Sequence, residues 1–104
     1  LSSALSSTSL ASTTSAPLLQ YRLQNHRRNV CCIAFHNTLQ LMATSSYDKT
    51  VIVYDLTTAP PSVQHHLKDH TDFILSVAFH PSLPLLSSGS DNSQIILYKL
   101  LTKK

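Results

Sequence analysis

Short apolar stretches alternate with polar segments along most of the chain, and this pattern predicts β-strands. VCCIAF and TVIVYD, for example, are rich in the β-branched and aromatic residues that favour strands. No window of eleven residues holds the apolar stripe of an amphipathic helix. The pattern predicts eight strands in two groups of four, at residues 18–23, 30–35, 40–45 and 50–55, and at residues 62–67, 74–79, 84–89 and 94–99.

Several of these strands are apolar on both faces, which indicates how the sheets must pack. Val51, Ile52, Val53 and Tyr54 follow one another, and successive side chains of a strand point to opposite faces of its sheet. A sheet with one face in water would alternate apolar and polar residues instead. We therefore expect an all-β protein in which antiparallel sheets stack face to face.

The chain repeats itself after 44 residues without a gap. Residues 17–60 (repeat 1) and residues 61–104 (repeat 2) share 14 identical positions, and many other pairs exchange one apolar residue for another. The identities follow the apolar pattern, since the triplet Ala-Phe-His occurs at 34–36 and again at 78–80. A regular period of this length is typical of repeat architectures. The sequence therefore predicts a pair of structural repeats over residues 17–104.

The first sixteen residues differ from the rest in composition. They contain ten serine and threonine residues and otherwise only leucine and alanine. We interpret residues 1–16 as a disordered tail or linker. An organellar targeting segment is the alternative, although such segments are rich in arginine and the first arginine here is Arg22.

Charge and cysteine usage narrow the class of protein. The net charge of +3 is too small to require a nucleic-acid partner, and no apolar run approaches the ~20 residues of a membrane span. Cys31 and Cys32 are neighbours and would point to opposite faces of a strand. We interpret them as reduced thiols, which suit a reducing compartment, and we expect a cytoplasmic or nuclear protein.

Each repeat carries the same ordered set of motifs. Repeat 1 has His26, then IAFH, then LMATSSYDKTVIVYD, and repeat 2 has His70, then VAFHP, then LSSGSDN and IILY. In this order and spacing the repeats resemble the WD-repeat β-propeller family. The resemblance covers residues 17–104 and implies two antiparallel, four-stranded-type blades of a partial propeller that does not close into a ring.

The resemblance also implies a buried hydrogen-bond network in each blade, which the family builds from His, Ser or Thr, Asp and Trp. By position, the network residues are His26, Thr44, Asp48 and Tyr54 in repeat 1, and His70, Ser88, Asn92 and Tyr98 in repeat 2. Tyrosine replaces tryptophan in both repeats. Asn92 replaces aspartate, so repeat 2 lacks a carboxylate that could orient and stabilise a protonated His70. We therefore predict that the network of repeat 1 is the stronger.

These residue types can be mistaken for catalytic or metal-binding chemistry. The His, Thr and Asp of repeat 1 resemble a triad in composition, but no nucleophile-elbow glycines surround any serine. His65 and His66 would face opposite ways along a strand, and no second group of ligands has zinc-like spacing. Gly89 is the one glycine, which excludes a glycine-rich phosphate loop. We expect no catalytic residue, no metal and no cofactor, and we interpret the protein as one that is not an enzyme.

The resemblance places the loops 24–29, 46–49, 68–73 and 90–93 on one rim of the blades. The candidate partner-binding residues on this rim are Arg27, Arg28, Asn29, Tyr47, Lys49, Asp72, Phe73 and Asp91. Aromatic residues and arginine dominate the binding energy of many interfaces. The alternative is that Phe73 packs under its own blade and that the arginines are only solvated.

Two hypotheses for function follow. The first is a scaffold or adaptor module that binds other proteins or peptides through the rim. The second is an anion-binding surface for phosphoinositide or nucleic acid, formed by Arg22, Arg27 and Arg28. Closed propellers have about four to eight blades, so two blades must pack against further blades to complete one. We expect further blades of a larger parent protein, or other copies of this chain, as partners, and the sequence leaves both open.

Overall fold

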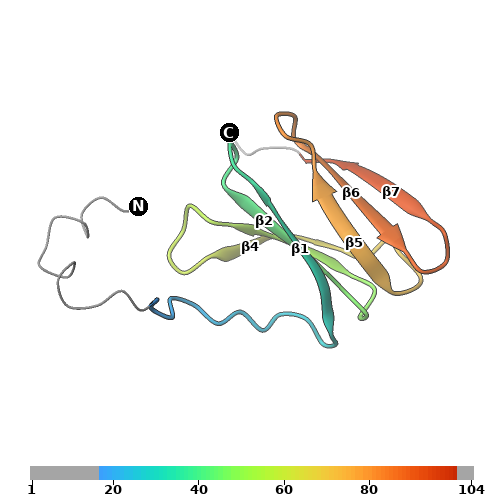
Figure 1. Ribbon diagram of the computed structural model, residues 1–104, viewed down its shortest axis with the longest axis horizontal. Helices are drawn as coiled ribbons and strands as arrows, with labels where there is room; N and C mark the ends of the chain where they lie inside the picture. The colour runs from blue at the N-terminus through green and yellow to red at the C-terminus, as the bar shows by residue number, and fades with distance from the viewer. Residues whose placement is uncertain (1–16, 101–104) are drawn as a thin grey trace, which may run out of the picture.

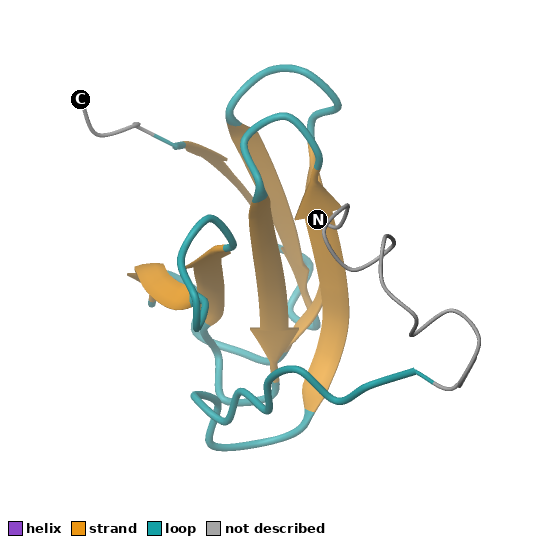
Figure 2. Ribbon diagram, turned by 90° about the vertical axis from the view of Figure 1, so that its left-hand side faces the viewer, coloured by secondary structure: helices purple, strands orange, loops and turns teal. Residues whose placement is uncertain are grey.

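A computed structural model describes residues 17–100, which form seven β-strands in two antiparallel sheets (Figures 1 and 2). The first sheet has the strand order β1-β2-β3-β4 and the second sheet the order β5-β6-β7. The strands are β1 (Val30–His36), β2 (Leu41–Ser46), β3 (Val51–Asp55), β4 (Ser62–Leu67), β5 (Ile74–Phe79), β6 (Leu85–Ser90) and β7 (Ile95–Lys99). Within the described residues there is no helix, and so none that could span a membrane. The predicted tail at 1–16 lies outside the described residues.

The fold is all-β, as the sequence predicts, and seven of the eight predicted strands lie within one residue of their expected bounds. Consecutive strands pair antiparallel, so that Ala43 of β2 lies opposite Ala34 of β1 and Val53 of β3. The outer strand of the first sheet, β4, comes from repeat 2 and pairs with β3, with Leu67 opposite Val51. Each structural unit is therefore shifted by one strand relative to the sequence repeat.

The prediction of a strand at residues 18–23, the first of the eight in chain order, is wrong. Residues 17–29 have no regular secondary structure and run as a loop into β1 (Figure 2). Leu18 and Leu19 are 79% and 71% exposed. A strand needs an open sheet edge to pair with, and β4 already occupies the outer edge of the first sheet. The apolar alternation of this segment is real, but the segment pairs with neither sheet of the described residues.

The core lies between the two sheets. Its buried cluster combines Leu41, Ala43, Val51, Val53, Ile74, Val77, Leu86 and Leu100. His36, at the end of β1, contacts the Phe79 ring edge-to-face with 5.5 Å between ring centroids. Its Nε2 donates to the carbonyl of Leu83 at 3.1 Å, and its Nδ1 accepts from the Leu39 amide at 3.2 Å. This satisfied, buried histidine joins the two sheets into one packed unit.

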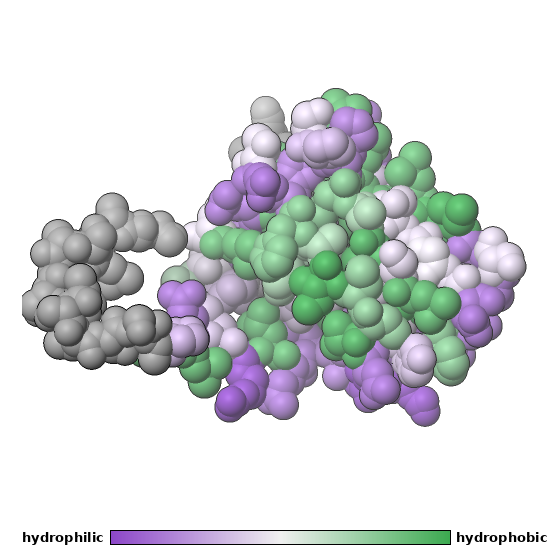
Figure 3. Space-filling view, in the orientation of Figure 1, coloured by the Kyte–Doolittle hydropathy of each residue, from purple (hydrophilic) through white to green (hydrophobic). Residues whose placement is uncertain are grey.

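The two sheets also leave apolar side chains on the faces that point away from each other. In β1, Ala34 packs against the core, so its neighbours Ile33 and Phe35 point outward and are 56% and 63% exposed. In β7, Ile95 and Leu97 are 80% and 65% exposed. A space-filling view shows apolar residues gathered over β1 and β5 (Figure 3). The stack of sheets thus ends on both sides in surfaces suited to further packing.

The turn between the second and third strand of each sheet has the same geometry. Lys49 and Ser93, which are equivalent in the repeat, adopt φ angles of 72° and 74°. Each donates its amide to the carbonyl three residues earlier, Ser46 at 3.2 Å and Ser90 at 3.1 Å. These left-handed positions let the chain reverse tightly, and they hold the rim loops in matching conformations on the two sheets.

Candidate functional site

His26, Thr44 and Asp48 meet at one end of the first sheet. Asp48 Oδ2 lies 2.9 Å from His26 Nδ1, and His26 Nε2 lies 2.6 Å from Thr44 Oγ1. The segment before β1 supplies His26, β2 supplies Thr44, and the turn between β2 and β3 supplies Asp48. The network therefore ties together three parts of the chain and holds the loop before β1 against the sheet.

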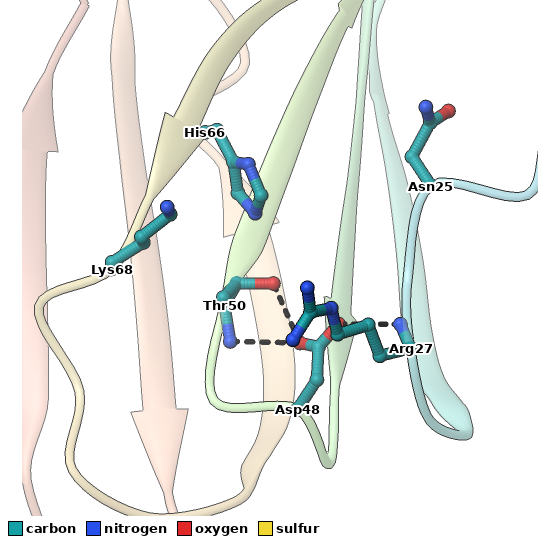
Figure 4. A pocket seen from close by; sticks show the side chains of 6 residues that line it. All are labelled: Asn25, Arg27, Asp48, Thr50, His66 and Lys68. Atoms are coloured by element: carbon teal, nitrogen blue, oxygen red, sulfur yellow. Dashed lines mark hydrogen bonds between the residues drawn. The ribbon is translucent and has the colours of Figure 1, made fainter.

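The Asp48 carboxylate receives more donors than the sequence predicts. The amide of Arg27 donates to Oδ2 at 2.9 Å, while the amide and hydroxyl of Thr50 donate to Oδ1 at 3.0 and 2.5 Å (Figure 4). Burial alone would raise the pKa of Asp48. The hydrogen bonds from Thr50, Arg27 and His26, with the attraction of His26, outweigh burial and hold that pKa well below its ordinary value. Asp48 is therefore ionised at neutral pH.

Tyr54 and Tyr98, expected within the networks, extend their hydroxyls to the loops that precede β1 and β5. The Tyr54 hydroxyl donates to Asn25 Oδ1 at 2.9 Å, and the Tyr98 hydroxyl donates to Asp69 Oδ2 at 3.1 Å. Each phenol thus reaches the residue just before the histidine of its network. Burial, then the charge and hydrogen bond of Asp69, raise the pKa of Tyr98 to about 12. The two tyrosines thus give each sheet a second hydrogen bond to the loop that precedes its first strand, β1 in the first sheet and β5 in the second.

The second sheet has a reduced version of the network. His70 Nε2 lies 2.7 Å from Ser88 Oγ, but within residues 17–100 its buried Nδ1 has no hydrogen-bond partner. Asn92, at the position equivalent to Asp48, donates from Nδ2 to Thr71 Oγ1 at 3.1 Å instead. Burial lowers the pKa of His70, and the charge of Asp69 opposes this only in part. The missing carboxylate thus leaves a buried imidazole half satisfied.

Two rim aromatics from different sheets stack on each other. The rings of Tyr47 and Phe73 lie 4.4 Å apart at their centroids and are inclined by 19°. Arg27, Arg28 and Lys49 line the same cavity, whose volume is about 510 Å³. Asp48 completes the lining, and we name the six residues Arg27, Arg28, Tyr47, Asp48, Lys49 and Phe73 the rim pocket. The expectation that Phe73 packs only under its own blade does not hold, because its ring contacts the neighbouring sheet.

The other predicted rim residues lie in the same loops but outside the rim pocket lining. The carbonyl of Asn29 accepts the Tyr47 amide at 3.0 Å, and the amide of Asp91 donates to the carbonyl of Phe73 at 2.9 Å. Asp72 accepts the Phe73 amide through its carboxylate at 2.7 Å. These three residues shape the loops that carry the aromatic pair. Arg22 is exposed and does not line the cavity with Arg27 and Arg28.

Sequence reasoning missed Asn25, Thr50, His66 and Lys68 as members of this region. Thr50 had a signal, because an aspartate two residues before a threonine often caps its amide in a turn. Asn25 had a weaker one, since it precedes His26 at the position where the family usually has glycine. His66 and Lys68 lie 16 and 18 residues after Thr50, near and just beyond the end of β4, and only the fold brings them to the same end of the sheet.

Stacked antiparallel sheets, the matched turns and a His-Thr-Asp network under one rim define two blades of a WD-type β-propeller. The first blade is the first sheet and the second blade is the second sheet. The family described as WD domain, G-beta repeat matches residues 18–55 and 61–99, which is more than half of the sequence. The chain belongs to this family.

Solved structures agree with the fold. The chain is similar to the crystal structure of Sqt1 from Saccharomyces cerevisiae, with a TM-score of 0.68 and 19% sequence identity over 72% of this chain. The similar region spans 20% of the Sqt1 chain. At this level of identity the likeness shows the fold alone. Among curated proteins, no sequence matches this chain.

Proposed function

We propose that the protein is a scaffold or adaptor module that binds partner polypeptides through the rim pocket. The observation that carries this proposal is the Tyr47–Phe73 stack, which joins two blades and is flanked by three cationic side chains in one cavity. WD40 repeats generally mediate protein interactions. The proposal includes no catalytic step, since His26 and Asp48 are engaged with each other and with Thr44 in a structural network.

The chemistry of the rim pocket favours a peptide with apolar and acidic residues. Tyr47 is 37% exposed and can bury further apolar surface under a partner. Arg27, Arg28 and Lys49 add positive charge around the ring pair, which attracts carboxylates and steers association. A stacked aromatic pair is already ordered before a partner arrives, so little side-chain entropy is lost on binding.

The test uses a peptide-display library selected on the complete chain. The combined variant Tyr47→Ala, Phe73→Ala should weaken the selected peptides by at least about tenfold, because aromatic hot spots carry most of the energy of such sites. Gln64→Ala, an exposed change on β4, should leave affinity unchanged and serves as the control. Circular dichroism checks that each variant keeps its strands. Peptides that bind the double variant as well as the original chain would overturn the proposal.

We also propose that the outward faces of both blades pack against further blades, from a larger parent protein or from other copies of this chain. The contact between the first and second blade supports this, because Ile74, Val77 and Phe79 of β5 occupy a buried interface. The equivalent residues of β1 are Val30, Ile33 and Phe35, and all three are exposed. They are therefore free to form the same kind of interface with another blade.

Light scattering tests the version of this proposal that involves copies. The chain alone should associate as its concentration rises, and Phe35→Asp should abolish the association because a charge cannot be buried unpaired. A chain that remains monomeric at every concentration would overturn assembly from copies. The free thiols of Cys31 and Cys32 support a reducing location, and we place the protein in the cytoplasm or nucleus as part of this proposal.

A further inference from the structure

The two blades pack on each other through two different faces, with β1 against β5 (Figure 1). The first blade contributes the face that carries Ala34 and His36 of β1, which we name the receiving face. The second blade contributes the face that carries Val77 and Phe79 of β5, which we name the inserting face. Phe79 meets the His36 ring edge-to-face, and the carbonyl of Leu83 accepts a hydrogen bond from His36 Nε2 at 3.1 Å. The contact thus joins a receiving face to an inserting face.

The second blade also has a receiving face, on the side that points away from the first blade. A cavity of about 310 Å³ lies on this side, and its lining includes Ala78, His80, Leu85, Ser87 and Leu97. The equivalent positions of the first blade are Ala34, His36, Leu41, Ala43 and Val53. In the first blade these positions pack against the second blade. The cavity therefore occupies the place at which the first blade holds its neighbour.

The ring of His80 is oriented like the ring of its counterpart His36. The Nδ1 of His80 accepts hydrogen bonds from the amides of Ser82 and Leu83 at 3.1 and 3.0 Å. The Nδ1 of His36 accepts one from the amide of Leu39 at 3.2 Å. A ring nitrogen that accepts such bonds carries no proton, so each neutral imidazole has its proton on Nε2. His80 is exposed, and its ring offers the same donor with which His36 binds the second blade.

The first blade carries an exposed inserting face on its own outward side. Phe35 is equivalent to Phe79 in the repeat, and it is 63% exposed. Beside it on the same face, Ile33 is 56% exposed. Leu39, in the turn that follows β1, is equivalent to Leu83. The groups with which the second blade engages the first are thus present a second time, at the opposite side of the chain.

We propose that the receiving face of the second blade binds the inserting face of a second copy of this chain, so that copies join head to tail. Phe35 of the second copy fills the cavity and meets the His80 ring edge-to-face. The Leu39 carbonyl of the second copy accepts the hydrogen bond from His80 Nε2. A second copy is the partner because the chain itself carries both halves of the contact, as a head-to-tail interface requires. The docking rests on the proposed packing of the outward faces, and it specifies the partner and the two faces that meet.

The test mixes two variants of the complete chain, each with one face blocked by a charge. Phe35→Asp blocks the inserting face and Leu97→Asp blocks the receiving face, since an unpaired charge is costly to bury. Analytical ultracentrifugation should find each variant monomeric alone, under conditions in which the original chain associates. The equimolar mixture should form a dimer and nothing larger, because one intact face of each kind remains. A mixture that stays monomeric would overturn the docking.

The matched control is Val63→Asp, which places the same charge at an exposed apolar position of β4, outside both faces. This variant should associate as the original chain does. Phe35 and Leu97 are exposed as well, so neither change removes a buried side chain, and circular dichroism checks that the strands persist. His80→Ala should weaken the association about tenfold, because it removes a hydrogen bond and an aromatic contact. Unchanged association of this variant would exclude His80 from the contact.

The remaining outcomes separate this docking from the proposed packing. If Leu97→Asp associates as well as the original chain while Phe35→Asp does not, two inserting faces meet each other. That result overturns the head-to-tail contact and leaves the proposed packing of outward faces intact. An original chain that stays monomeric at every concentration overturns docking between copies altogether. Further blades of a larger parent protein are then the partners of both faces.

Discussion

The two blades share a sequence pattern but differ in how much of it they bury. In the first blade, residues 51–54 of β3 are buried almost completely. In the second blade, the equivalent residues of β7 alternate between exposed and half-buried. The first blade is covered on three sides. The strand β4 lies on its outer edge, and the second blade packs on one of its faces. On its other face, Asn25 and His26 bond to the side chains of Tyr54 and Thr44. The difference teaches that burial of these strands depends on their neighbours more than on their own residues.

The hydrogen-bond network is also more complete in the first blade than in the second. His26 has partners on both ring nitrogens, whereas His70 has one on Nε2 alone within the described chain. The turn around Asn92 nevertheless keeps the form of the turn around Asp48, since each residue at this position donates its amide to the serine hydroxyl two residues earlier. One substitution has therefore removed a hydrogen bond without changing the backbone that would present it.

The largest expected difference concerns the centre of the third strand in each blade. Ile52→Ala should lower the free energy of unfolding by about 3 kcal/mol, because Ile52 is 1% exposed and its loss leaves a cavity. Ile96→Ala, at the equivalent half-buried position, should cost about 1 kcal/mol. Urea unfolding followed by circular dichroism measures both. Equal losses for the two variants would break the comparison between the blades.

The next difference concerns the two networks. Asp48→Ala should cost about 2 kcal/mol, because it leaves the donors of His26, Thr50 and Arg27 without their acceptor. Asn92→Ala should cost less than about 1 kcal/mol, since the Asn92 side chain is exposed and bonds the Thr71 hydroxyl of the loop before β5 and the Gln94 amide of its own turn. The same unfolding experiment compares the two. A larger loss from Asn92→Ala would reverse the predicted order of the networks.

The pH dependence of stability should sharpen this result. The folded pKa of Asp48 lies below its ordinary value, so the unfolded chain binds more protons in the acidic range. The stabilising contribution of Asp48 is therefore complete above the ordinary pKa of 3.8 and is lost as the pH falls from that value toward the folded pKa. Asp48→Asn should flatten the acid limb of the stability curve. An unchanged acid limb would show that Asp48 is not the group responsible.

A smaller effect should come from restoring the carboxylate to the second blade. Asn92→Asp should stabilise the chain by about 1 kcal/mol near pH 6, because the new acceptor can reach the unpaired Nδ1 of His70. The carboxylate would raise the pKa of His70, which burial now lowers. A raised folded pKa gives stability that is present at lower pH and lost as the pH rises, so the gain should shrink toward pH 8. A gain that grows with pH would contradict this pairing.

The strands and their stacking could be predicted from sequence because both depend on local patterns. The apolar residues at 51–54 indicated burial on both faces, and the 44-residue repeat placed equivalent strands in both units. Residues 18–23 carry the same kind of pattern but form no strand. Pattern describes what a segment can bury, whereas pairing also needs an open edge in the right place, which the sequence does not show.

The candidate site was predictable only in part. The resemblance to the WD-repeat family identified His26, Thr44 and Asp48, and the structure joins these three residues by hydrogen bonds. The stacking of Tyr47 on Phe73 depends on the distance between two blades, and no spacing along the chain reports that distance. The approach of Lys68 to Arg27 likewise depends on where β4 ends relative to the turn of another hairpin.

The smallest expected effect tests whether the blades differ in their turns. Ser93 and Lys49 both hold a left-handed conformation that glycine adopts without steric cost. Ser93→Gly and Lys49→Gly should each stabilise the chain by about 0.5 kcal/mol, since the relief of strain exceeds the added entropy of the unfolded chain. Urea unfolding measures the gain in stability of each variant. Equal gains would mean that the blades differ in the segments packed against them and in their hydrogen-bond networks, and not in these turns. Lys49→Gly alone should also weaken peptide binding at the rim pocket, because it removes one of the three cations. A gain confined to one turn would instead mean that the two backbones are not equivalent.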